Sequence, residues 1–71
     1  MISVKVNLFV LRQEGLNLNL PDGSMLKDVV GHFNLDQRKD IVLVVNGQRR
    51  PLDDLLKDGD EVSIFPMLEG G

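Results

Sequence analysis

Apolar and polar residues alternate at the start of the chain. The apolar positions of this first segment are Ile2, Val4, Val6, Leu8 and Val10, and the residues between the first four are polar. A period of two predicts a strand that buries one face. The same alternation returns over residues 16–20, after a polar connection that ends in Gly15. We therefore expect the two segments to form an antiparallel hairpin.

A helical spacing follows the turn-forming segment 21–23. The apolar residues Leu26, Val29, Val30 and Phe33 fall at positions i, i+3, i+4 and i+7, which predicts one apolar stripe that packs on the leucines of the hairpin. Ser24 is expected to cap the helix and Asn34 to end it. Gly31 costs about 1 kcal/mol relative to alanine. We therefore expect a short helix that depends on its packing.

Strand patterns return in the second half of the chain. The unbroken apolar and mostly β-branched run 41–45 predicts a strand buried on both faces or central in a sheet. Asn46-Gly47 predicts a type I′ turn into a short edge strand over 48–50 that ends at Pro51. A turn over 58–60 leads to a last strand over 61–65, with Val62 and Ile64 on one face. Between these strands, a short helical turn is expected to fill the core with Leu52, Leu55 and Leu56.

The order of these elements predicts an α+β roll, in which one helix crosses one face of a mixed sheet of four to five strands. We expect one domain over residues 1–66 and a flexible tail over 67–71. The 71 residues, 42% of them hydrophobic, suffice for one small core but not for a deep substrate cavity. We expect no signal peptide and no membrane span. The lack of cysteine fits a reducing compartment, so a cytoplasmic location is expected.

Charge narrows the choice of partners. With 8 basic and 11 acidic residues, the net charge of −3 argues against binding to nucleic acid, and no membrane partner is expected. Acidic residues dominate from Asp53 onward, where Lys57 is the sole basic residue. A basic partner surface is therefore expected to be attracted to that end of the chain.

The usual catalytic constellations are missing from the sequence. There is no cysteine, and His32, the only histidine, is expected in the last turn of the helix, where its ring suits the helix dipole. The serines lack the spacing of a nucleophilic triad, and the glycines do not form a phosphate-binding loop. We therefore expect a chain that is not itself an enzyme and that binds no metal and no cofactor of its own.

With those sites excluded, the candidate functional feature of the sequence is its carboxyl terminus. Gly70 and Gly71 have no Cβ, so this end can adopt almost any φ and thread a narrow channel in another protein. An extended chain from Pro66 to Gly71 reaches about 20 Å, enough to enter the active site of a partner. The alternative is a frayed end without a role.

An apolar patch is expected at the root of this tail. Phe9 and Leu11 occupy the polar phase of the first strand, and Phe65 occupies the outward phase of the last, just before Met67 and Leu68. If the two strands are neighbours, these residues form a partner surface on the face opposite the helix. The alternative is that Phe9 or Phe65 turns into the core.

Segment 58–71, DGDEVSIFPMLEGG, resembles the end of the small β-grasp sulfur carriers. These are ubiquitin-like proteins that include the small subunit of molybdopterin synthase and the thiamine-biosynthesis sulfur carrier. The matching features are the final turn, the last strand, the Phe-Pro step and the terminal Gly-Gly. The hairpin, the single helix and the turn at 45–47 agree as well, so the resemblance covers the whole chain and implies a β-grasp fold.

The resemblance implies a co-substrate whose Gly71 carboxylate is adenylated and then converted to a thiocarboxylate. The adenylation would be catalysed by a ubiquitin-activating-like adenylyltransferase that uses ATP and Mg, and the sulfur would come from a donor persulfide. An acceptor enzyme, such as a molybdopterin synthase large subunit, would take the sulfur. Leu68, Glu69 and Gly70 would form the arm that enters the partner.

We expect the apolar patch at the root of the tail, with Phe9, Leu11, Phe65 and Met67, to contact the activating enzyme. Phe65-Pro66 favours the molybdopterin branch, although residues 67–69 depart from the small and proline-rich residues expected there. The alternatives are a carrier for thiamine or tRNA thiolation, a ubiquitin-like modifier joined to lysines through Gly71, and a plain β-grasp interaction module with an incidental tail.

Overall fold

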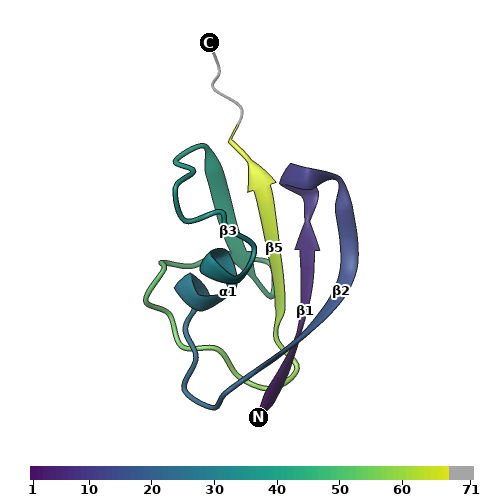
Figure 1. The fold of residues 1–71 in the computed structure, drawn as a ribbon, viewed down its shortest axis with the longest axis vertical. Coiled ribbons are helices and arrows are strands. Elements are labelled where there is room, and N and C mark those ends of the chain that lie inside the picture. Colours follow the sequence, from purple (N-terminus) through teal and green to yellow (C-terminus); the bar gives the residue numbers. More distant parts are fainter. Residues whose placement is uncertain (68–71) are drawn as a thin grey trace.

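A computed structural model of the protein describes residues 1–67 and contains a five-stranded sheet with one helix, α1 (Leu26–His32), on one face (Figure 1). The strands are β1 (Ile2–Leu8), β2 (Gln13–Leu20), β3 (Ile41–Val45), β4 (Gln48–Arg49) and β5 (Glu61–Pro66). Their order in the sheet is β2-β1-β5-β3-β4, with β1 and β5 parallel and the other neighbours antiparallel. This mixed sheet with one helix is the α+β, β-grasp roll that the sequence predicts.

The core lies between the sheet and α1. The alternation in β1 and β5 orients the apolar side chains as expected, because every second residue of a strand faces the helix. Leu26, Val29 and Val30 of α1 are buried against them. The strand residues of this layer with the least exposure are Val4, Val6, Leu8, Val62 and Ile64. Burying one such side chain contributes about 1.5–3 kcal/mol.

The hairpin differs from its predicted form at its tip. β1 ends at Leu8, and a short 3-10 helix, η1 (Phe9–Leu11), replaces the expected continuation of the strand. β2 begins at Gln13, and the register between the two strands shifts by one residue at a bulge near Gly15. Gly15 has a φ of +72°, which other residues rarely adopt.

The helix has the predicted end but a different start. Ser24 does not cap it: its hydroxyl donates to the carbonyl of Pro21 at 2.7 Å and closes the preceding turn. Met25 is the first flanking residue, and its N–H donates to the carboxylate of Asp28 at 2.7 Å. Asn34 has a φ of +59° and ends the helix as expected.

The second half of the chain contains one correction. β3 is half-buried except for Val45, so it is not covered on both faces, but it lies inside the sheet between β5 and β4, which is the other form that the apolar run predicts. The segment 51–57 forms no helical turn, and only Leu56 of its three leucines enters the core, whereas Leu52 and Leu55 are exposed. The Asn46-Gly47 turn has positive φ at both residues, as a type I′ turn requires.

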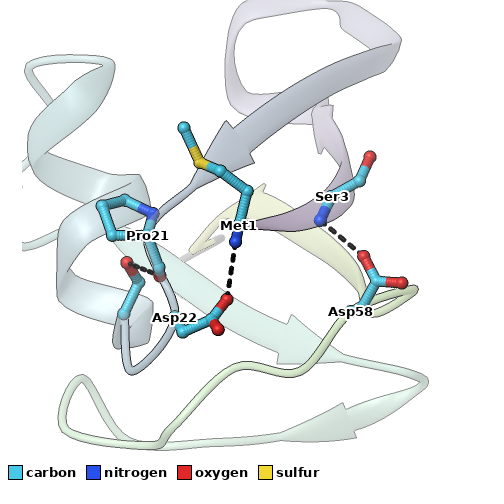
Figure 2. A network of polar contacts seen from close by, with 6 residues as sticks. Met1, Ser3, Pro21, Asp22 and Asp58 are labelled. Atoms are coloured by element: carbon cyan, nitrogen blue, oxygen red, sulfur yellow. Dashed lines mark hydrogen bonds and ion pairs between the residues drawn. The ribbon is translucent and has the colours of Figure 1, made fainter.

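The loop before β5 is tied to the start of β1. The N–H of Ser3 donates to the carboxylate of Asp58 at 2.7 Å (Figure 2). The N–H of Gly59 donates to the carbonyl of Ser3 at 2.8 Å. These bonds help to hold β1 and β5 side by side. In the part of the chain that the structure describes, no helix is long and apolar enough to cross a membrane.

Candidate functional site: an aromatic stack at the root of the tail

The parallel pairing of β1 and β5 creates the candidate site. Because β1 and β5 run in the same direction, their carboxyl ends lie next to each other at the same end of the sheet (Figure 1). Leu8, the last residue of β1, pairs with Ile64, so η1 follows β1 directly beside the end of β5. There the rings of Phe9 and Phe65 stack, with centroids 4.9 Å apart and planes 21° apart.

The stack lies on the sheet face that α1 does not cover. Val62 and Ile64 point into the core, so the alternation places Phe65 on the other face, 38% exposed. Phe9 is half-buried. β1 and β5 are neighbours, which is the condition on which the expected apolar patch depended, although the 3-10 helix, and not a longer β1, carries Phe9.

Three further apolar residues lie next to this stack or at the same end of the sheet. Leu11, in η1, is 42% exposed, and Met67, directly after β5, is 40% exposed. Val42 was missed from the sequence: it pairs with Phe65 across β3 and β5 and is half-buried on the same face. An unbroken apolar run does not indicate which of its residues face away from the helix, so only the pairing of β3 with β5 could identify Val42. The outer patch is defined as Phe9, Leu11, Val42, Phe65 and Met67.

The root of the tail is anchored next to this patch. The N–H of Met67 donates to the carbonyl of Asp40 at 2.7 Å, which continues the pairing of β5 with β3 by one step. The guanidinium of Arg38 contacts the Asp40 carboxylate at 3.1 Å. This hydrogen bond lowers the pKa of Asp40 and raises the pKa of Arg38. The expected tail residues Leu68, Glu69, Gly70 and Gly71 lie outside the described residues.

A buried polar network beside the patch was not anticipated. Asn7 belongs to the outward row of β1 but is only 6% exposed. Its side-chain amide donates to the carboxylate of Glu61 at 2.8 Å and to the hydroxyl of Ser63 at 3.3 Å, and its oxygen accepts from the N–H of Gly15 at 2.9 Å. The network joins β1 to both neighbouring strands at the bulge. Nothing in the alternation distinguishes Asn7 from Lys5, so the sequence did not reveal it.

The chain has one histidine, His32. His32 lies exposed in the last turn of α1, as expected, with its ring edge-on to that of Phe33. Within residues 1–67, no group of three histidine or carboxylate side chains could hold a metal ion. The outer patch offers an exposed apolar surface at the root of the tail.

Comparison with known proteins agrees with this picture. Residues 4–71 match the ThiS family. The chain belongs to the ThiS family. It is thus a small, ubiquitin-like β-grasp protein of the sulfur-carrier type, as the sequence resemblance implied, and small carriers of this family are generally not catalysts. No curated protein sequence matches the chain.

Solved structures of similar proteins superpose over nearly the whole ThiS-family chain. A protein described as molybdopterin converting factor, subunit 1, from Pyrococcus furiosus has 28% identity and a TM-score of 0.81, with 96% of this chain and 100% of that chain covered. SAMP1 from Haloferax volcanii has 23% identity and a TM-score of 0.74, with coverages of 97% and 99%. The thiamine biosynthesis protein ThiS from Geobacter metallireducens has 18% identity and a TM-score of 0.72, with coverages of 99% and 100%. The last two similarities concern the fold alone.

Proposed function

We propose that this protein carries sulfur as a thiocarboxylate on Gly71 and delivers it in the biosynthesis of a cofactor, molybdopterin being the favoured product. The observation that carries the proposal is the exposed Phe9–Phe65 stack at the root of the segment FPMLEGG. An activating enzyme that covers the outer patch would be positioned to receive the chain end that follows Met67.

The chemistry requires help from other proteins. The Gly71 carboxylate would attack the α-phosphorus of ATP in a ubiquitin-activating-like adenylyltransferase, releasing pyrophosphate and forming an acyl adenylate. A donor persulfide would then attack the acyl carbon, and AMP would leave. A thiol of a partner protein would cleave the remaining S–S bond to free the thiocarboxylate, because this chain has no cysteine. ATP and Mg would belong to the activating enzyme.

Two observations favour the molybdopterin branch. The Phe65-Pro66 step resembles that branch, and the Pyrococcus protein described as a molybdopterin converting factor is more similar in sequence than the Geobacter thiamine protein, at 28% against 18% identity. The acceptor would then be the large subunit of molybdopterin synthase. The carboxylate of Glu69 would require a basic side chain of that subunit close to it in the channel.

Intact-mass analysis tests the carrier role directly. The protein is co-expressed with its adenylyltransferase and sulfur donor and purified under reducing conditions. We expect a fraction in which one oxygen has been replaced by sulfur, and no such fraction in a variant that lacks Gly70 and Gly71. A ladder of lysine adducts linked through Gly71 would instead show protein tagging. Full biological function of the truncated variant would show that the tail is incidental.

A second measurement separates the two cofactor pathways. The thiocarboxylated protein is mixed with the molybdopterin synthase large subunit and its pterin precursor, and in parallel with the thiazole-forming enzyme of the thiamine pathway. We expect loss of the sulfur mass only in the first mixture. Loss only in the second mixture would assign the protein to thiamine biosynthesis.

A further inference from the structure

A shallow depression lies beside the outer patch, on the same face of the sheet. Its lining comes from β1, η1, β2 and β5 and consists of Lys5, Asn7, Phe9, Glu14, Gly15 and Glu61. The aromatic stack therefore contributes part of the lining through Phe9, and the rest of the lining includes charged side chains. A protein that covers Phe9 and Phe65 would also cover this depression.

The carboxylate of Glu61 is held in place at this depression. One of its oxygens accepts the hydrogen bond from the Asn7 amide at 2.8 Å, and the buried Asn7 is itself fixed by Ser63 and by the N–H of Gly15 at the bulge. A side chain that is already fixed loses less conformational entropy when a partner binds it. Glu61 is therefore a preorganised acceptor for a donor group from outside.

The local charge is negative. Glu14 and Glu61 contribute two carboxylates, whereas Lys5 contributes one ammonium group. Lys5 pairs in register with Glu61 through the backbone, but within residues 1–67 its side chain forms no ion pair with either carboxylate at 4.0 Å or less. The outer patch next to it carries no charged residue.

We propose that this depression receives a basic side chain, lysine or arginine, from the protein that covers the Phe9–Phe65 stack. This inference rests on the proposed function for the identity of that protein, the activating enzyme. The partner surface would combine an apolar centre opposite the outer patch with a positive charge opposite Glu14 and Glu61. Such complementarity speeds association and fixes the orientation of the docked chain.

The test compares two variants that lose the same charge. Glu14→Gln/Glu61→Gln removes both carboxylates of the depression and leaves an oxygen that can accept from Asn7. Asp36→Asn/Asp53→Asn removes two exposed carboxylates outside the strands of this face. Binding of each full-length variant to the purified adenylyltransferase is measured by stopped-flow kinetics at several salt concentrations. We expect the first variant to associate about tenfold more slowly than the second, with a weaker dependence on salt.

Equal rates and equal salt dependence for the two variants would overturn this inference without affecting the carrier role. Phe65→Asp in the same assay reports on the docking surface separately, because it leaves the depression's carboxylates in place. Normal binding of Phe65→Asp would show that the outer patch is not the docking site, and the proposed role of the depression would then be overturned as well. Formation of the thiocarboxylate, read by intact mass, tests the carrier function independently of both.

Discussion

Phe9 and Phe65 stack with their ring centroids 4.9 Å apart. The two residues are 56 positions apart in the chain, and only the pairing of β1 with β5 in the sheet brings them together. Phe65 is 38% exposed, so the pair belongs to the surface and not to the core. An aromatic pair contributes about 0.5–1.5 kcal/mol beyond the area that it buries. The fold should therefore tolerate its loss, whereas a partner that binds it should not.

The first prediction concerns Phe65→Asp. We expect binding to the activating enzyme to weaken by about thirtyfold or more, because losing an aromatic anchor at the centre of an interface commonly costs at least about 2 kcal/mol. The variant should remain folded, as measured by circular dichroism and urea unfolding. Unfolding of Phe65→Asp at 25 °C would show that this side chain belongs to the core.

Ile64→Ala is the matched control at the neighbouring position. Ile64 points to the opposite face of β5 and is fully buried. We expect a loss of about 2–5 kcal/mol in the free energy of unfolding, because a cavity remains in the core. Urea titration measures it, and a loss below 1 kcal/mol would contradict the assigned faces of β5.

The second prediction concerns Asn7→Ala. This change removes the partner of Gly15, Glu61 and Ser63, and we expect it to lower the free energy of unfolding by about 1–3 kcal/mol. Lys5→Ala, on the same row of β1 but exposed, should change it by less than about 0.5 kcal/mol. Backbone amide shifts of Gly15 and Phe9 should move in the first variant only. Equal stabilities of the two variants would refute a structural role for the network.

The third prediction compares two asparagines with positive φ. Asn34 has a φ of +59° at the end of α1, so Asn34→Ala should destabilise the protein by about 1–2 kcal/mol, whereas Asn34→Gly should be nearly neutral. Asn46 also has a positive φ, but its side chain bonds to Asp60 and to the N–H of Glu61. Asn46→Gly should therefore destabilise the protein. Thermal unfolding of the three variants checks this contrast.

The fourth prediction concerns pH. The hydrogen bond from Arg38 lowers the pKa of Asp40 in the folded protein. A carboxyl whose pKa is lowered on folding adds stability above its unfolded pKa, and this contribution disappears as the pH falls through the folded pKa. In an NMR titration, Arg38→Gln should raise the pKa of Asp40 toward its ordinary value. An unchanged titration curve would show that the ion pair does not persist in solution. Both side chains are exposed, so the effect on stability should be small.

Local patterns predicted several elements well. The alternation of Ile2 to Leu8 and of Val62 with Ile64 identified their buried faces, because the side chains of a strand alternate whatever its neighbours are. Asn46-Gly47 and Asn34 were recognised because their backbone conformations are local requirements. The prediction that Ser24 caps the helix was wrong, because a serine hydroxyl can form a hydrogen bond within a turn, here with the carbonyl of Pro21, as readily as it can cap a helix.

The faces, the turns and the end of the helix thus follow from the order of residues alone, since each depends on interactions between close neighbours in the chain. The candidate site follows only in part, because the alternation placed Phe9 and Phe65 on the outward face but left open whether their strands are neighbours. Phe9 meets Phe65, Val42 joins the outer patch and Asn7 becomes buried because β5 inserts between β1 and β3. That insertion pairs the first strand with the last, and such a long-range pairing is selected by the packing of the whole domain, which no short stretch of sequence encodes.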